Sequence, residues 1–369
     1  MTDHILVLGA GYAGLGAAKR AARRLPRARV TLVNASGLFV ERVRLHQLAA
    51  GQRLPELPLT GLLQGTGIDL VVARVTGIDL ATRTVTLDGP PHRIGYDMLV
   101  YALGSAAELD AVPGVREHAH TLATADEAAR LRRRLAESRE VTVVGGGLTG
   151  IEAATEFAST RPDLRVSLLS GGPIGPGLSV RARGHLHRAF SRMGIAVREH
   201  APVAKVGEAG LLLEDGQEIA GETVVWAAGF RVPDLAAAAG LATDEEGRMI
   251  VDDTLRSVSH PDVLGIGDAA APGRGGRPAR MACQTGLPMG LYAGEAAADL
   301  LAGRTPRRAR YRYVWQNISL GRHDGVTQFT RADDSPLDAV LTGRASAAFK
   351  EAITRGTVWV MRHPVPIPG

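Results

Sequence analysis

The chain has 369 residues, of which 45% are hydrophobic and 22% are charged, with a mean hydropathy of +0.02 and a formal net charge of +5. This composition excludes an intrinsically disordered chain and suits a globular protein with two or three cores. No apolar run reaches the ~18 residues that a membrane-spanning helix needs. Because a core-like strand begins almost at the N-terminus and leaves no room for a signal peptide, we expect a cytoplasmic protein.

The basic residues and the cysteine content exclude further classes of protein. Apart from Lys19, Lys205 and Lys350, the basic side chains are arginines, and they do not alternate with aromatic residues as on nucleic-acid-binding surfaces. We therefore expect no nucleic-acid partner. Cys283 is the only cysteine, so one subunit has no pair of thiols that could form a disulfide or relay electrons. The histidines lack metal-ligand spacing, and we expect no metal site.

The first glycine motif lies near the N-terminus, in "ILVLGAGYAGL" from Ile5 to Leu15. An apolar stretch typical of a buried parallel strand runs into Gly9, Gly11 and Gly14, and an alanine-rich helix follows. In such a turn the first glycine permits the bend, the second lets backbone amides approach a pyrophosphate, and the third lets helix and strand pack closely. The free N–H groups at the helix start then favour phosphate. The motif predicts a dinucleotide site.

The same motif recurs in the middle of the chain, in "EVTVVGGGLTGIEAATEFA", where the glycines are Gly145, Gly147 and Gly150. One such motif is weak evidence, because a glycine-rich turn can occur without a ligand. Two motifs, each between a strand pattern and a helix pattern, are much stronger evidence. They indicate two dinucleotide-binding units and hence two nucleotides. The late position of the second motif is explained if its unit is inserted into the first.

The position that usually holds a ribose-binding acid is not acidic in either unit. Asn34 lies twenty residues after Gly14, and Ser170 lies twenty residues after Gly150. Asn34 can still hydrogen-bond a ribose hydroxyl, although without charge assistance. Ser170 does not repel a 2′-phosphate, and Arg181 and Arg183 follow soon after it. Either NADH or NADPH therefore remains open, as does the simpler interpretation that both arginines are solvated.

Three further segments have the pattern of a strand that ends in a glycine turn. They are "YDMLVYALGS" (96–105), "ETVVWAAGF" (222–230) and "HPDVLGIGDAAA" (260–271). In the last of them we expect the strand to end at Gly267 and Asp268 and a helix to open there. The Asp268 carboxylate would accept hydrogen bonds from ribityl hydroxyls, and the helix N-terminus would face the pyrophosphate of a flavin nucleotide.

Taken in order, "VLGAGYAG", "YDMLVYALGS", "VVGGGLTGIE", "VVWAAG" and "VLGIGDAA" resemble the pyridine nucleotide–disulfide reductase superfamily, whose members have two dinucleotide-binding domains. Within it the chain most resembles type II NADH:quinone oxidoreductases, from residue 1 to about residue 345. The resemblance implies an α/β fold with two Rossmann-like domains, the second inserted in the first. It places an FAD-binding domain at 1–112 and 226–300, an NAD(P)H-binding domain at 113–225, and a small C-terminal α+β segment at 301–369.

The resemblance also implies which residues bind the two cofactors, FAD and NADH or NADPH. The FAD pyrophosphate would lie on the first glycine turn, the adenosine ribose near Asn34, the adenine at the Val75 backbone, the ribityl chain at Asp268, and the adenosine and phosphates near Arg42 and Arg44. The residues implied on the FAD side are Gly9, Ala10, Gly11, Tyr12, Ala13, Gly14, Asn34, Arg42, Arg44, Val75, Ala102, Gly104, Gly267 and Asp268. Those on the NAD(P)H side are Gly145, Gly147, Leu148, Thr149, Gly150, Ser170 and Gly229.

Three residues are candidates for catalysis. Glu152 matches a glutamate that the family places near nicotinamide and flavin, where it could orient the nicotinamide or manage protons; alternatively it only interacts with the dipole of its helix. Gln284 matches the glutamine of an Ala-Gln pair that lines the quinone site in type II enzymes. Cys283 replaces that alanine, either as a small packing residue or as a group that tunes the flavin. A second glutamine often found in the family is replaced within Leu287–Met289.

The C-terminal segment departs from the amphipathic membrane-binding helices with which type II enzymes commonly end. "GRASAAFKEAITRGTVWVMRHP" predicts one helix, with a short apolar face formed by Ala348, Phe349, Ala352 and Ile353. We expect this face to pack on the core or on a second subunit of a homodimer, with at most peripheral membrane contact on the inner face of the cell membrane.

The resemblance predicts an FAD-dependent NAD(P)H dehydrogenase that passes hydride from nicotinamide to FAD and then electrons to a small acceptor, a quinone or a quinone-like molecule. Two alternatives remain open. One is a flavoenzyme of specialised metabolism that acts on a small aromatic or heterocyclic substrate. The other is a redox-sensing protein that holds FAD and NAD(H) without turnover.

Overall fold

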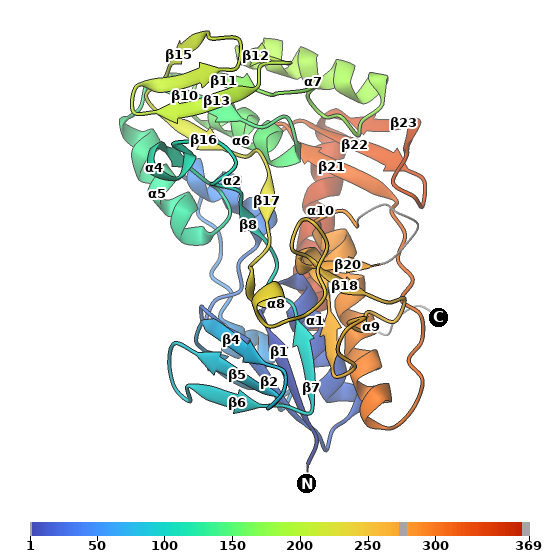
Figure 1. Ribbon diagram of the computed structural model, residues 1–369. Helices are drawn as coiled ribbons and strands as arrows, with labels where there is room; N and C mark the ends of the chain where they lie inside the picture. The colour runs from blue at the N-terminus through green and yellow to red at the C-terminus, as the bar shows by residue number, and fades with distance from the viewer. Residues whose placement is uncertain (1, 273–278, 364–369) are drawn as a thin grey trace.

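Two five-stranded parallel sheets form the framework of the computed structural model, which describes residues 2–272 and 279–363 (Figure 1). The first sheet has the order β19 (Val263–Gly265), β7 (Met98–Tyr101), β1 (His4–Leu8), β2 (Arg29–Asn34) and β3 (Asp69–Val72). The second has the order β12 (Ala196–Arg198), β11 (Arg165–Leu169), β10 (Glu140–Val144), β16 (Val224–Trp226) and β9 (Ala119–His120). The predicted α/β fold with two Rossmann-like units is confirmed.

Helices connect and cover these sheets, as parallel strands require. In chain order they are α1 (Tyr12–Arg24), η1 (Arg42–Arg44), α2 (Leu45–Ala49), α3 (Leu59–Leu63), α4 (Val115–His118), α5 (Ala125–Glu137), α6 (Leu148–Thr160), α7 (Val180–Met193), α8 (Leu235–Ala238), η2 (Gly267–Ala269), α9 (Cys283–Leu301) and α10 (Gly343–Arg362). The two glycine turns join β1 to α1 and β10 to α6, so each lies at the carboxyl end of a central strand. This is where open parallel sheets bind their ligands.

Smaller sheets complete the fold. Three of them are antiparallel with three strands: β4 (Val75–Asp79), β5 (Thr84–Leu87) and β6 (Arg93–Gly95); β13 (Val203–Gly207), β14 (Gly210–Leu213) and β15 (Glu218–Ala220); and β21 (Trp315–Ser319), β22 (Gly325–Thr330) and β23 (Pro336–Thr342). Two pairs remain: β17 (Phe230–Arg231) with β8 (Ala106–Ala107), and β18 (Met249–Val251) with β20 (Ala270–Pro272).

The path of the chain matches an inserted second unit. The first sheet takes strands from residues 4–101 and then from 263–265, whereas the strands of the second sheet lie between 119 and 226. The outgoing segment β8 and the returning segment β17 pair antiparallel between the two sheets (Figure 1). The limits at 112/113, 225/226 and 300/301 stay predictions.

The prediction that a helix begins at Asp268 is wrong. Only the short 3-10 turn η2 forms there, and the chain continues as β20, which pairs parallel with β18. The pairing of Ala270–Pro272 with Met249–Val251 satisfies the backbone groups that a helix would otherwise use. The helix begins instead at Cys283, at the start of α9.

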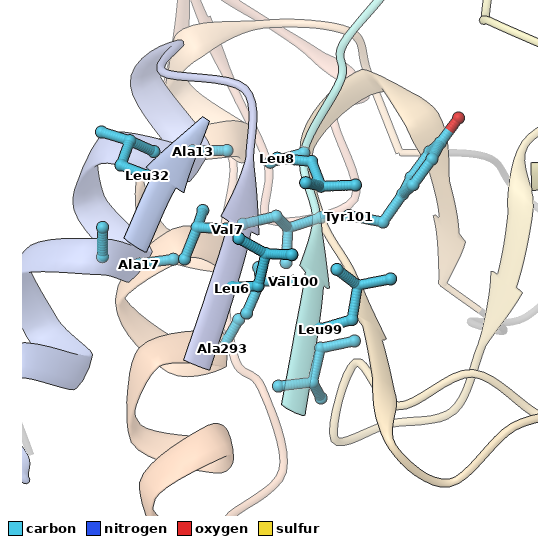
Figure 2. Packing of buried hydrophobic residues seen from close by; sticks show 14 of the residues in the cluster. Leu6, Val7, Leu8, Ala13, Ala17, Leu32, Leu99, Val100, Tyr101 and Ala293 are labelled. Carbon is cyan, nitrogen blue, oxygen red and sulfur yellow. The ribbon is translucent and has the colours of Figure 1, made fainter. Parts of the chain in front are cut away.

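Close packing between α1 and α9 fixes the position of that second helix. Figure 2 shows alanines of both helices, Ala13, Ala17 and Ala293, beside the buried branched side chains of β1 and β7. A methyl group on Gly290 would overlap the Ala13 carbonyl, and one on Gly294 would overlap that of Ala17. Glycine is therefore required for the two backbones to approach this closely.

The C-terminal segment contains the predicted helix, α10, packed beside β21–β23 (Figure 1). Its inward side carries Phe349, Ser346 and Met361. The Phe349 ring packs edge to face on the Trp315 ring, with 5.3 Å between the ring centroids. Ala348 and Ala352 of the predicted apolar face are exposed. Across residues 2–272 and 279–363 no helix is long and apolar enough to span a bilayer.

The contact between α1 and α9 predicts an asymmetry between two Gly→Ala substitutions. Gly290→Ala should lower the free energy of unfolding by about 1–3 kcal/mol, because the added methyl group forces the helices apart. Gly356→Ala in α10 meets no atom within 4 Å and should leave stability unchanged or raise it by about 0.5–1 kcal/mol. Denaturant unfolding checks both, and equal effects would show that the close contact is not needed.

Candidate dinucleotide and acceptor site

The first glycine turn has the geometry of a phosphate cradle. A methyl group on Gly14 would overlap the Gly9 carbonyl, and one on Gly9 would overlap the carbonyl of Ala102 at the end of β7. By contrast, nothing lies within 4 Å of the position that a Cβ on Gly11 would occupy. The turn is therefore closed on its protein side and open at Gly11, the position at which backbone amides would meet a pyrophosphate.

The second glycine turn repeats this pattern. A Cβ on Gly150 would overlap the Gly145 carbonyl, and one on Gly145 would overlap the backbone at Ala227, just after β16. Gly147 again faces open space. Leu148 and Thr149 form the first positions of α6 next to this opening, and Leu148 is 36% exposed. Two turns of unrelated surrounding sequence thus offer the same shape for a bound phosphate group.

Asn34 and Ser170, which stand where a ribose-binding acid is usual, contact the backbone of the glycine turns. The Asn34 side chain accepts a hydrogen bond from the Ala10 amide at 2.9 Å and donates one to the Ser36 carbonyl at 2.7 Å. Ser170 is buried against Gly146 at the end of β11. Both side chains therefore shape the backbone of a glycine turn. Their contact with a ribose stays a prediction.

A polar cluster joins three segments beside the first turn. Asp268 accepts a hydrogen bond from the Ser105 hydroxyl at 2.7 Å, and Arg42 Nη1 lies 3.8 Å from the same carboxylate. Arg42 also donates to the Ser105 carbonyl at 2.9 Å and passes 3.7 Å from the position of a Cβ on Gly104. Gly267 lies directly against Ala13 in the first turn. The structure therefore brings Arg42, Gly104, Gly267 and Asp268 to one place next to α1.

The start of α9 reaches the same place. A Cβ on Gly286 would lie 3.6 Å from Ala13 Cβ and 4.0 Å from Gly267 Cα, so Cys283 and Gln284 lie one turn away from both. Cys283 is half-buried, and its removal from water raises the pKa of its thiol, which therefore stays protonated near neutral pH. Tyr12 packs edge to face on Phe39, and burial raises its pKa well above the usual value.

The Gln284 amide is already engaged. Its Oε1 accepts a hydrogen bond of 2.6 Å from Arg280 Nη2. Arg280 also pairs with Asp334 at 3.2 Å, and its guanidinium lies 4.8 Å from the centre of the Tyr313 ring. Arg280 thus connects the start of α9 to the β21–β23 sheet. The sequence offered no indication of this role, because Arg280 lies in an arginine-rich chain outside any motif.

Other predicted residues lie away from this cluster. Arg44 turns toward α10, where it pairs with Glu41 at 3.1 Å and with Glu351 at 2.9 Å. Val75 is buried at the start of β4, which follows β3 at the far edge of the first sheet. Gly229 lies between the sheets, where its carbonyl accepts a hydrogen bond of 3.3 Å from the Glu108 amide. Their roles in binding nucleotide stay predictions.

Glu152 lies in a buried polar network at the beginning of α6. Its carboxylate accepts hydrogen bonds from the Ser319 amide at 2.9 Å and the Ser319 hydroxyl at 3.1 Å, and it forms an ion pair with Lys350 of α10. His46 of α2 lies 3.8 Å from the same carboxylate. Glu152 is only 8% exposed, and it has these partners in addition to any interaction with the dipole of its helix. Sequence reasoning identified Glu152 and missed its three partners.

Burial controls the protonation of this network. It lowers the pKa of Lys350 to about 7, and the nearby Arg44 cation acts in the same direction while Glu351 opposes it. Burial, with the cations of Lys350, Arg322 and Arg44, lowers the pKa of His46 well below its usual value. His46 is therefore a neutral neighbour at working pH, whereas Lys350 can gain or lose its proton near neutrality.

A cavity of about 890 Å³ opens onto this network, within the size range of small-molecule sites. Ser319 and Lys350 line it, together with side chains of η1, α2, the segment that follows α2, and α10. The cavity therefore lies between the early residues 41–57 and the C-terminal helix. Within the described ranges no group of three or more histidine, cysteine or acidic side chains is placed to hold a metal ion.

Comparison with known proteins agrees with this architecture. The family model of the pyridine nucleotide-disulphide oxidoreductases matches residues 3–289. The chain belongs to this family. As a member it is an oxidoreductase whose cofactors are FAD and a pyridine nucleotide, which suits the two open glycine turns and the Asp268 cluster.

Individual relatives cover most of the chain. An NADH dehydrogenase-like protein of Mycobacterium tuberculosis is 35% identical over 79% of this chain and 78% of its own length. A type II NADH:quinone oxidoreductase of Staphylococcus haemolyticus is 26% identical over 96% of this chain and 95% of its own.

Two solved structures share the fold with a TM-score of 0.82 each. The sulfide:quinone oxidoreductase of Aquifex aeolicus is 20% identical over 98% of this chain and 92% of its own, and NDH2 of Plasmodium falciparum in complex with NADH is 15% identical over 98% of both chains.

The two open glycines predict separable losses of ligand. Gly11→Val should reduce the FAD that copurifies with the protein to less than about a tenth, because its side chain fills the space of the pyrophosphate. Gly147→Val should keep the FAD and weaken nicotinamide nucleotide binding more than about ten-fold. Flavin absorbance and nucleotide titration measure the two effects.

Gly61→Val, in α3, is the matched control, because Gly61 also faces open space but lies outside both turns. It should retain both ligands. If Gly147→Val lost FAD and Gly11→Val lost the nicotinamide nucleotide, the assignment of the two turns would be reversed.

Proposed function

We propose that this protein is an FAD-dependent NAD(P)H:acceptor oxidoreductase, which passes hydride from nicotinamide to the flavin and electrons onward to a quinone or quinone-like acceptor. The observation that carries the proposal is the position of Glu152. It lies within the first turns of α6, next to the second glycine turn, and its carboxylate contacts Lys350, which lines the large cavity. One network therefore connects the proposed donor site with the proposed acceptor site.

Two further observations support this proposal. The second cysteine needed for a thiol relay is absent from the sequence, so electrons must leave the flavin directly for an acceptor. The relatives include enzymes named as NADH:quinone and sulfide:quinone oxidoreductases, which favours a quinone as that acceptor.

The protein's own residues would bind the two cofactors, orient the Glu152 carboxylate and supply a proton to the acceptor. The amides at Gly11 and Gly147 would hold the two pyrophosphates, and Asp268, fixed by Ser105, would accept hydrogen bonds from ribityl hydroxyls. The bound FAD supplies two-electron chemistry between donor and acceptor. Ser319 orients the Glu152 carboxylate, which in turn holds Lys350 at the inner end of the cavity.

Proton delivery is the proposed task of Lys350. Reduction of a quinone to a hydroquinone takes up two electrons and two protons, and a buried ammonium with a pKa of about 7 can supply one of those protons near neutral pH. Glu152 stabilises the protonated form. His46, kept neutral by burial and by the surrounding cations, adds no competing charge.

Steady-state turnover tests the proposed function. The purified yellow protein, mixed with NADH or NADPH and a soluble naphthoquinone, should oxidise the nucleotide continuously and form hydroquinone. Rapid flavin reduction without turnover on any quinone would point instead to a specialised substrate. Slow reduction with almost no reoxidation would support a redox-sensing protein and contradict the proposal.

Removal of the Lys350 amine should affect only the acceptor half of the reaction. Lys350→Met should slow reoxidation of the reduced flavin by naphthoquinone at least about 10²-fold, because a general acid is lost, while reduction by NADH changes little. In the unmodified protein reoxidation should slow as the pH rises through about 7, where Lys350 loses its proton. This pH dependence should disappear in the variant.

Lys205→Met, at an exposed position of strand β13, is the control for this experiment. It should match the unmodified protein in both half-reactions. If Lys350→Met kept the same pH profile, Lys350 would not be the group that titrates.

A further inference from the structure

The cavity beside Glu152 is strongly cationic. Seven of its lining side chains are arginine or lysine, and two are acidic. The cations are Arg44, Arg53, Arg322, Arg344, Lys350, Arg355 and Arg362, and the acids are Glu41 and Glu351. A concave, low-dielectric surface with charges of mainly one sign concentrates ligands of the opposite sign.

Four of the seven cations already have acidic partners. Arg44 pairs with both lining glutamates, and Arg355 also pairs with Glu351 at 2.7 Å. Arg322 pairs with the buried Glu156 at 2.7 Å, and Lys350 pairs with Glu152. These four charges are balanced by acidic side chains of the protein, so they add little net charge for an anionic ligand.

The rim carries the uncompensated charge. The side chains of Arg53, Arg344 and Arg362 are exposed and form no hydrogen bond or ion pair with any of the described residues. They come from two distant parts of the chain, the segment after α2 and the two ends of α10, yet all three line the same opening. Arginine binds carboxylate, sulfonate or phosphate through paired N–H groups.

Apolar side chains also line the cavity, next to polar ones such as Gln47, Gln52 and Thr354. Leu54, Pro55 and Leu57 contribute from one side, and Val358 and Trp359 from α10. Trp359 stacks on the His363 ring with 4.8 Å between the ring centroids, and it is still 57% exposed, which is unusual for a large aromatic side chain. An occupant that matches this surface has an apolar, ring-containing body and an anionic group directed toward the rim.

We propose that the acceptor that enters this cavity is an anionic aromatic compound, with its ring near Lys350 and its carboxylate, sulfonate or phosphate on the rim arginines. This inference rests on the proposed function and narrows its acceptor. The reaction balances as two electrons and one proton from the reduced nicotinamide, together with one proton from water delivered through Lys350, which convert a quinone to a hydroquinone. The anionic group of the acceptor is unchanged.

The test compares a naphthoquinone sulfonate with the neutral parent naphthoquinone as acceptors for NADH oxidation. The double substitution Arg53→Gln/Arg344→Gln should raise the KM for the sulfonate about ten-fold more than the KM for the parent, because two charge-assisted contacts are lost. Added salt should raise the KM for the sulfonate in the unmodified protein and have less effect in the variant. Arg133→Gln on α5, an exposed arginine outside the cavity, is the control and should change neither KM.

Binding without turnover separates this inference from the proposed function. Calorimetric titration with naphthalene sulfonate should show binding that the double substitution weakens about ten-fold and that uncharged naphthol does not reproduce. If no quinone is reduced but this binding is found, the proposed function fails and the anionic site stands. Equal effects on charged and neutral compounds would overturn the inference. The inference would also be overturned if the double substitution abolished binding to anionic lipid vesicles and left both KM values unchanged. The rim arginines would then bind a membrane surface.

Discussion

The close contact between α1 and α9 is the constraint on which the cofactor side of the molecule depends. Gly290 and Gly294 let the backbone of α9 touch the carbonyls of Ala13 and Ala17, a distance that any Cβ would forbid. Since α1 begins at the first glycine turn, the contact carries the start of α9 to the same point, where Gly267 also meets Ala13. Segments separated by more than 250 residues thus meet beside the first glycine turn.

A second junction, which is electrostatic, joins the inserted unit to the C-terminal segment. The β21–β23 sheet brings Ser319, and α10 brings Lys350, to the Glu152 carboxylate of the inserted unit. Burying an ion pair costs desolvation free energy, and here the two Ser319 hydrogen bonds offset part of that cost. Burial, together with the nearby Arg44 cation, lowers the pKa of Lys350 to about 7. A group that titrates near neutral pH is therefore placed between the nucleotide turn and the cavity.

The sequence predicted what local patterns encode. Both glycine turns, the parallel sheets and the C-terminal helix follow from spacing and apolar runs, whereas Glu152 became a candidate through the family resemblance and its catalytic role stays a prediction. The helix expected at Asp268 failed because Ala270–Pro272 pairs with a strand whose partner no local pattern reveals. Lys350 could not be predicted, because its burial depends on contacts across 198 residues with Glu152. Arg44 was placed by resemblance, whereas its side chain turns to Glu351.

The central claim is that one chain holds a flavin within hydride-transfer distance of a nicotinamide. Its most direct test is anaerobic stopped-flow mixing of the purified protein with one equivalent of NADH. The account predicts rapid bleaching of the flavin absorption band in proportion to the NADH added. If the protein binds FAD but neither NADH nor NADPH bleaches it, the second glycine turn does not deliver hydride to the flavin and the account is contradicted.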